Sequence, residues 1–300
     1  MKQGAALALK LSPLAVPLGA VFFTGILMAV MQSLGLLLPP PAGAPGPAGG
    51  STGAGAGPLG AYRALFTGAW FLQDLGFSLY CAFTSAVLSV AAGTMLAYLV
   101  WRSPRRFQQV AILSKIPLIL PHIAVAFIVL MLFGATGYLS SVARTLGIIG
   151  SSSDFPRILY GGGIGIILAY IYKETPFTML LVTAVLKRFD FRRVDTALML
   201  GAGRLTVFFR VVCPHLVPVL HTTFIILFLY SFGAFDIPFM LGESRPAMLS
   251  VQVYDLYFRR DLANRPQAMA ILVLMFLFSI LFIFLYTRMS ERLDIAGRRV

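Results

Sequence analysis

Long apolar runs separated by short polar stretches make up most of the chain. A helix needs about 20 mainly apolar residues to cross a bilayer, and six runs reach that length. They lie at residues 13–38, 77–100, 110–134, 158–186, 216–241 and 267–287. The pattern predicts an all-α, polytopic membrane protein of about six transmembrane helices.

A polar segment at residues 189–218 separates the fourth and fifth runs. Its four arginines, Arg192, Arg193, Arg204 and Arg210, require water or an interface. It nevertheless keeps apolar residues at helical spacing. These positions are Val194, Ala197, Leu198 and Gly201, followed by Leu205, Phe208, Phe209 and Val212. The spacing predicts two short amphipathic helices that meet at Gly201-Ala202-Gly203, with Pro214 ending the second.

Charge and composition set the expected orientation. The chain is 58% hydrophobic and 12% charged, with mean hydropathy +0.86 and net charge +13. Basic residues collect at the cytoplasmic ends of membrane helices, and this explains the charge better than nucleic-acid binding does. The loops richer in lysine and arginine contain Lys2, Lys10, Arg102, Arg105, Arg106, residues 187–210, Arg288, Arg292, Arg298 and Arg299. Both termini and the 189–218 segment are therefore expected to be cytoplasmic.

This orientation divides the chain into four parts. Residues 1–38 are expected to form a cytoplasmic N-terminus and the first transmembrane helix, whose apolar run is too long for a secretory signal. Residues 39–60 are rich in proline and glycine and cannot build a packed core, so we expect an external linker. Residues 61–290 would hold five transmembrane helices, and residues 291–300 a cytoplasmic tail.

Residues 249–264 form a further amphipathic stretch on the expected external side. Leu249, Val253, Leu256 and Tyr257 give it an apolar face, opposite the charged residues Asp255, Arg259, Arg260 and Asp261. An interfacial helix is the simple interpretation, and a docking surface for an external partner is the alternative.

Residues suited to catalysis or metal binding are sparse. The histidines His122, His215 and His221 have no metal-ligand spacing, and neither do Cys81 and Cys213. No G-x4-G-K-[ST] phosphate-binding loop occurs. We therefore expect no metal, no cofactor and no enzymatic activity in this chain.

Three charged residues interrupt the apolar runs. Lys173 and Glu174 lie in the middle of the fourth run, two residues before Pro176, and Asp236 lies late in the fifth, before Pro238. Such charges usually face the bundle interior or water, and we expect each proline to bend or break its helix. The candidate translocation-path residues are Tyr170, Lys173, Glu174, Phe232, Phe235 and Asp236. The alternative is that Lys173 pairs with one of the acids as a structural link.

The 189–218 segment resembles the cytoplasmic loop of type I ATP-binding-cassette importer permeases, E-A-A-x3-G-A-x5-F-x2-I-x-L-P. Here Asp195, Thr196 and Ala197 occupy the E-A-A positions, Gly201 and Ala202 match the G-A pair, Phe208 follows, and Pro214 closes the motif. The departures are Asp for Glu, Thr for the first Ala, and Cys213 for Leu. The resemblance covers residues 62–290 and is nearest to the polyamine, aminoalkylphosphonate and ferric-iron branch.

The resemblance implies a permease subunit without chemistry of its own, in a bacterial cytoplasmic membrane. The loop helix would couple to cytoplasmic ATPase subunits, beside an identical or homologous second permease. An external binding protein would deliver a small polar solute, for which the candidates are a polyamine or related cation, an aminoalkylphosphonate, or iron.

Other classes remain as alternatives. A secondary transporter driven by an ion gradient would favour internal repeats, and none is evident. An intramembrane enzyme would have only Lys173, Glu174 and Asp236 to work with. An exporter permease is disfavoured because the loop resembles that of importers.

Overall fold

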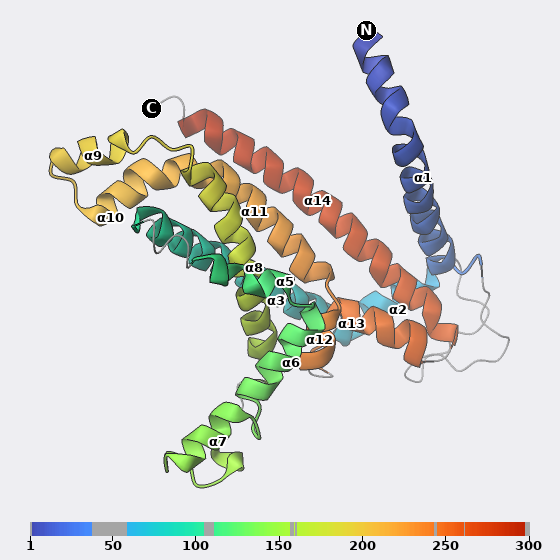
Figure 1. Cartoon of the computed structure of the whole chain (residues 1–300). Coiled ribbons are helices and arrows are strands. Elements are labelled where there is room, and N and C mark those ends of the chain that lie inside the picture. Colours follow the sequence, from blue (N-terminus) through green and yellow to red (C-terminus); the bar gives the residue numbers. More distant parts are fainter. Residues whose placement is uncertain are drawn as a thin grey trace. The chain divides into compact units, whose positions relative to one another are not determined.

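The computed structural model describes residues 2–37, 59–104, 111–156, 159, 161–242, 245–260 and 262–297. Within these ranges the chain folds into helices and short turns, without a strand (Figure 1). Almost all of the expected linker at 39–60 lies outside the described residues. The last helix continues to Gly297, so most of the expected tail at 291–300 is helical.

Two compact units make up the fold. Unit 1 comprises residues 1–72 and 249–284, and unit 2 comprises residues 73–248 and 285–300. Unit 1 contains α1 (Lys2–Ser33), α2 (Gly60–Thr67), α13 (Leu249–Tyr254), a π-helix (Asp255–Arg259) and a 3-10 helix (Leu262–Asn264). The long helices α3 (Ala69–Arg102) and α14 (Arg265–Gly297) run from one unit into the other.

Unit 2 contains the remaining helices. They are a 3-10 helix (Ala111–Lys115), α5 (Ile116–Ile119), α6 (His122–Phe133), α7 (Tyr138–Thr145), a 3-10 helix (Ser152–Asp154), α8 (Ile164–Leu186), α9 (Arg192–Met199), α10 (Arg204–Val207), a π-helix (Phe208–Val212), α11 (Cys213–Gly233) and α12 (Asp236–Leu241).

Among the described residues, six helical stretches are long and apolar enough to cross a membrane, as predicted. They are Ala15–Ser33, Ala69–Arg102, His122–Thr145, Ile164–Leu186, Arg204–Gly233 and Leu262–Arg288. The boundaries differ most for the third and fifth runs. The third is interrupted at Leu120 and Pro121, and the fifth begins at Arg204 and ends at Gly233 instead of spanning 216–241.

Helix α8 is the central element of unit 2. It packs against α5, α6, α11 and α12, and more than half of its apolar core is buried, compared with a third or less in each other span. Its contact with α3 is close at one point. A Cβ added to Gly93 would lie 2.5 Å from Thr178 Cβ and 2.7 Å from the Thr175 carbonyl oxygen. A small residue at this position lets the two helices approach, as is common in membranes.

The amphipathic stretch at 249–264 is helical over residues 249–259, as α13 and the π-helix, and again over Leu262–Asn264 as a 3-10 helix, where one helix was predicted. Leu249 and Leu256 are buried, while Asp255 and Arg259 form a salt bridge of 3.5 Å one turn apart on the polar side. Whether it lies at a membrane interface or meets a partner stays a prediction.

Candidate functional site

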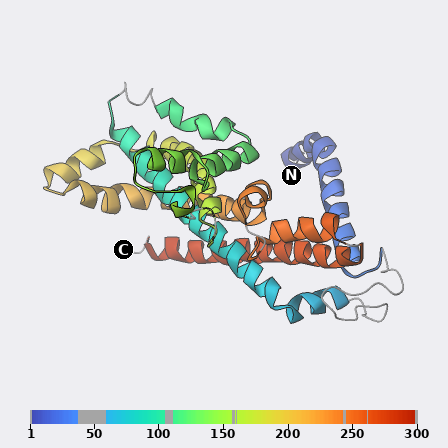
Figure 2. The ribbon, with the colours of Figure 1, turned by 90° about the horizontal axis from the view of Figure 1, so that it is seen from below.

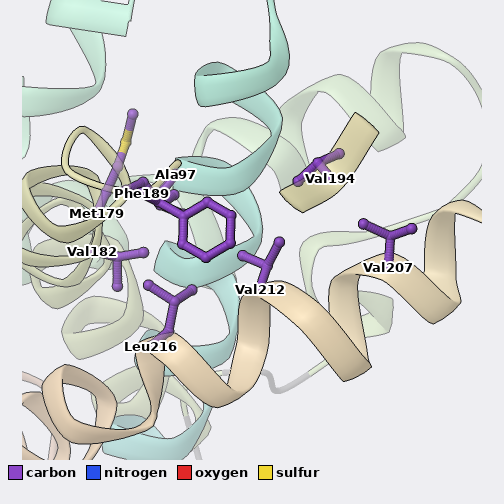
Figure 3. Packing of buried hydrophobic residues seen from close by; sticks show 9 residues of the cluster. Ala97, Met179, Val182, Phe189, Val194, Val207, Val212 and Leu216 are labelled. Atoms are coloured by element: carbon purple, nitrogen blue, oxygen red, sulfur yellow. The ribbon is translucent and has the colours of Figure 1, made fainter. Parts of the chain in front are cut away.

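The segment 189–218 is here called the coupling segment, after the role that its resemblance to importer permeases implies. It is anchored by a buried apolar cluster in unit 2. Phe189, Val194, Val207, Val212 and Leu216 of the segment pack with residues of α3 and α8. The partners are Ala97, Met179, Val182 and Leu186. Figure 3 shows the Phe189 ring between Val182 and Val212. The base of the segment is therefore fixed to two membrane helices.

Aromatic contacts reinforce this base. Trp101 at the end of α3 stacks on Phe191, with ring centroids 4.1 Å apart. Tyr98, one turn earlier, contacts Phe208, with a centroid distance of 4.7 Å. These rings join the end of α3 to both ends of the hairpin.

The opposite end of the hairpin is exposed. α9 and α10 project from one end of unit 2 in both views (Figures 1 and 2). The side chains of Met199, Leu200 and Leu205 at the tip are 89%, 82% and 75% exposed. Gly201 forms the turn in the left-handed region, with φ of +84°. An apolar tip in a polar segment is typical of a protein interaction surface.

The turn that leads into α9 is stabilised by a residue that sequence reasoning did not single out. The Asp190 carboxylate accepts a hydrogen bond of 3.0 Å from the Arg192 backbone N–H. Asp195 lies in the first turn, exposed, where the helix dipole favours an acid. Thr196 donates to the Arg192 carbonyl oxygen at 2.8 Å. An aspartate just before a helical pattern, where its carboxylate can accept from the backbone N–H two residues on, was the signal that would have identified Asp190.

The second predicted helix does not end at Pro214. α10 continues through the π-helix into α11. Proline has no N–H to bond the Arg210 carbonyl, and the wider π turn accommodates this gap. The predicted apolar face was right for Val212, which is buried, and for Phe208, which is partly buried. It was wrong for Leu205 and Phe209, which are exposed, and it left out the buried Val207. Ala197 and Ala202 are partly buried against the cluster.

Lys173 on α8 binds backbone carbonyls at the break in the third run. Its ammonium donates to the carbonyl oxygens of Pro117 at 2.8 Å and Leu118 at 3.2 Å, and also to that of Leu120. Pro121 has no N–H, so the Pro117 carbonyl lacks its normal helical donor. The side chain, 7% exposed, supplies the missing donors. The alternative of a Lys173–acid pair is wrong, since no described acid forms a salt bridge with it.

Glu174 points to other helices. The Ser231 hydroxyl of α11 donates to its Oε1, and the Tyr170 hydroxyl donates to the Ser231 carbonyl oxygen at 3.5 Å. Ser89 of α3 lies beside the carboxylate, but neither its hydroxyl nor Glu174 Oε2 has a partner with normal hydrogen-bond geometry. A carboxylate that is 3% exposed with one unpaired oxygen is a costly arrangement, and costly buried groups mark functional sites.

The other candidate path residues lie nearby but differ in exposure. Phe232 is buried and stacks on Phe228, whereas Phe235 stacks on Phe239. Asp236 is exposed at the start of the separate helix α12. It was expected late in the fifth span, and this was wrong because the chain leaves that helix at Gly233. Asp236 thus lies in the first turn of α12, where the helix dipole favours an acid.

Pro176 does not break its helix. α8 is continuous from Ile164 to Leu186, because its neighbours pack around it on several sides. The other proline in a charged stretch, Pro238, lies in the first turn of α12, where its missing N–H costs nothing.

A second buried acid was missed by sequence reasoning. Asp74 of α3, 2% exposed, accepts a hydrogen bond of 2.9 Å from the Ala247 backbone N–H. The residues are 173 positions apart, so no local pattern links them. Among the described residues, no group of three or more histidine, cysteine or acidic side chains is arranged to hold a metal ion.

Residues 89–295, more than half of the chain, match the family described as binding-protein-dependent transport system inner membrane component. The chain belongs to this family of transport permeases. The match includes the whole coupling segment and the intramembrane polar residues. It confirms the predicted family and the membrane-spanning, all-helical fold.

Individual relatives are distant. A ferric transport system permease protein FbpB 1 of Haemophilus influenzae is 27% identical over 191 residues, which are 63% of this chain and 29% of that protein. The molybdenum transport system permease ModB of Azotobacter vinelandii is 26% identical over 61% of this chain and 80% of its own length. This chain thus corresponds to less than a third of the ferric relative.

A solved structure shares the fold over nearly the full length. It belongs to a bacterial alginate ABC transporter in complex with an alginate-bound periplasmic protein. The TM-score is 0.74 at 17% identity, and the alignment covers 97% of both chains. At this identity the likeness establishes the arrangement of helices and does not extend to the solute.

Proposed function

We propose that this chain is the transmembrane permease subunit of an ATP-binding-cassette importer, translocating a small polar solute delivered by an external binding protein. The observation that carries the proposal is the exposed apolar tip of the coupling segment, on a base anchored to α3 and α8. Family membership supports it. An ion-driven secondary transporter has no use for such a projecting, anchored hairpin.

The coupling segment would dock on a cytoplasmic ATPase subunit. Met199 and Leu200 offer apolar surface, and Asp195 offers an exposed carboxylate for a partner arginine. Closure of the ATPase pair would move α9, and the packed Phe189 cluster would carry that movement into the membrane helices. ATP hydrolysis would take place in that separate subunit.

The remaining partners and the topology follow from the same assignment. The permease would pair with a second, identical or homologous permease in the bacterial inner membrane. With the coupling segment in the cytoplasm, six spans place both termini there too. The excess of basic residues in the coupling segment supports this orientation.

We also propose that Glu174 and Asp236 line or gate the translocation path, together with Tyr170, Phe232 and Phe235. Lys173 has its charge satisfied by carbonyl oxygens, which leaves Glu174 without a cationic partner among the described residues. Two acids without a basic partner favour a cationic solute, in keeping with the polyamine and iron candidates.

Co-purification tests the docking site. Wild type, Leu200→Asp and the control Leu146→Asp would be isolated from native membranes in a mild detergent. Leu146 is also exposed, at 68%, but lies at the end of α7. We expect an ATPase subunit to co-purify with wild type and with the control. The amount that co-purifies with Leu200→Asp should be at least tenfold lower. An ATPase retained by Leu200→Asp would refute docking at the tip, and none with wild type would favour ion-driven transport.

A further inference from the structure

An open groove of about 1140 Å³ runs along unit 2 beside the coupling segment. Its walls come from the second half of α3, from α10 and the π-helix, from α11, and from Tyr286 of α14. Much of its lining is apolar, with side chains such as Val87, Val90, Leu220 and Phe224. Neither Glu174 nor any other candidate path residue lines it, so the groove is separate from the proposed path.

Among the polar side chains in the wall of the groove, Thr94, His221 and Tyr286 are satisfied within the wall. Thr94 donates to the Val90 carbonyl oxygen at 2.6 Å, and His221 Nδ1 lies 2.5 Å from the Tyr286 hydroxyl in a hydrogen bond. The wall therefore presents mainly hydrocarbon surface. Such a surface accepts an apolar chain at no cost in lost hydrogen bonds.

The mouth of the groove is cationic. Arg102 and Arg204 line its end next to the coupling segment. Arg102 is held in place because its Nη1 donates to the Tyr98 hydroxyl at 3.1 Å and its guanidinium lies 5.7 Å from that ring's centroid. Neither arginine forms a salt bridge with a described acid. Two guanidinium groups without a carboxylate are suited to a phosphate group.

The length of the groove fits one leaflet of a bilayer. Val87 and Arg102 are fifteen residues apart on α3, a rise of about 22 Å along the helix. Half of a bilayer, headgroups included, is about 20–22 Å thick. The two arginines therefore lie at headgroup depth when the apolar wall spans the acyl region.

We propose that this groove binds an anionic phospholipid, with the phosphate between Arg102 and Arg204 and an acyl chain along α3 and α11. The lipid would contact both Tyr98 and Phe208, which hold the base of the coupling segment. The site depends on membrane residence alone and stands whether or not the segment docks on an ATPase.

Native mass spectrometry of the protein with its co-purified subunits, in micelles that contain added phospholipid, tests the headgroup preference. Phosphatidylglycerol would be compared with phosphatidylcholine for wild type, Arg102→Gln/Arg204→Gln and the control Arg188→Gln/Arg193→Gln. The control removes the same charge from exposed residues that do not line the groove. We expect the Arg102/Arg204 variant to bind phosphatidylglycerol about 30-fold more weakly, or about 2 kcal/mol for two arginines, and the control to bind normally. Equal loss in both variants, or no preference for phosphatidylglycerol, would overturn the site.

A photo-crosslinker locates the bound molecule. Benzophenylalanine would replace Met95, which lines the groove and is 62% exposed, or Phe127 of α6, which is 50% exposed outside it. At Met95 we expect an adduct with the mass of phosphatidylglycerol that disappears in the Arg102/Arg204 variant, and at Phe127 an adduct without headgroup preference. A crosslink from Met95 to a protein chain would assign the groove to a subunit interface and overturn the proposal.

Discussion

The ammonium of Lys173 donates a hydrogen bond of 2.8 Å to the carbonyl oxygen of Pro117, joining the fourth span to the break in the third. Its neighbour Glu174 points to Ser231 of the fifth. Adjacent residues on a helix face different directions, so one pair of charges links α8 to two other helices. Carbonyl oxygens therefore offset the cost of burying Lys173, whereas the Ser231 hydroxyl offsets only part of the cost of burying Glu174, whose Oε2 has no partner.

Replacing Lys173 with methionine should destabilise the protein. The carbonyls of Pro117, Leu118 and Leu120 would lose a buried, charged donor, and one such bond contributes about 1.5–3 kcal/mol. We expect a lower midpoint of thermal unfolding in detergent. The exposed Lys115→Met is the matched control and should leave the midpoint unchanged. Equal midpoints for the two variants would contradict the role given to Lys173.

Replacing Glu174 with glutamine removes the negative charge and keeps the size and shape of the side chain. The amide oxygen still accepts from the Ser231 hydroxyl, so folding should be retained while the negative charge is lost. We expect uptake to fall at least tenfold for whichever candidate solute wild type transports, tested with labelled putrescine, aminoethylphosphonate and ferric iron. Asp236→Asn should act in the same direction. Normal uptake by both variants would remove them from the path.

Gly93→Ala should destabilise the contact of α3 with α8. The added methyl would lie 2.5 Å from Thr178 Cβ and 2.7 Å from a backbone oxygen that cannot move freely, and overpacking of this kind costs about 1–3 kcal/mol. Gly76→Ala lies on the same helix with nothing within 4 Å of the added carbon. At this position the higher helix propensity of alanine should stabilise α3 slightly. Thermal unfolding of both variants would reveal the difference, and the same shift in both would argue against the close approach.

Gly201→Ala should strain the turn of the coupling segment without a clash. An added Cβ meets nothing within 4 Å, but φ is +84°, which costs about 1–2 kcal/mol for a residue with a side chain. Gly203 has φ of −67°, so Gly203→Ala should be close to neutral. Hydrogen exchange across residues 192–212 would measure the effect, with faster exchange in Gly201→Ala alone. Similar rates in both variants would indicate that the turn adapts.

Much of the coupling segment was predictable from local pattern. The exposed turn at Gly201, the first helix and the position of Asp195 follow from spacing and charge, which are properties of neighbouring residues. The face of the second helix was predicted wrongly at two positions, since Leu205 and Phe209 had the right spacing yet are exposed. Residues 205–212 are apolar except at Thr206 and Arg210, so periodicity offered no way to choose between faces.

The sequence by itself determined the number of spans, the family signature and the place of Lys173 and Glu174 within the fourth span, because hydropathy and motif spacing are read along the chain. Tertiary structure alone decided what the charges bind. Lys173 meets a carbonyl 56 residues away, and Glu174 meets a hydroxyl 57 residues away. It also decided that α8 tolerates Pro176 in its interior and that the helical chain continues through Pro214 as part of α11. These outcomes depend on which distant backbone and side-chain groups packing brings together, and no local pattern contains that information.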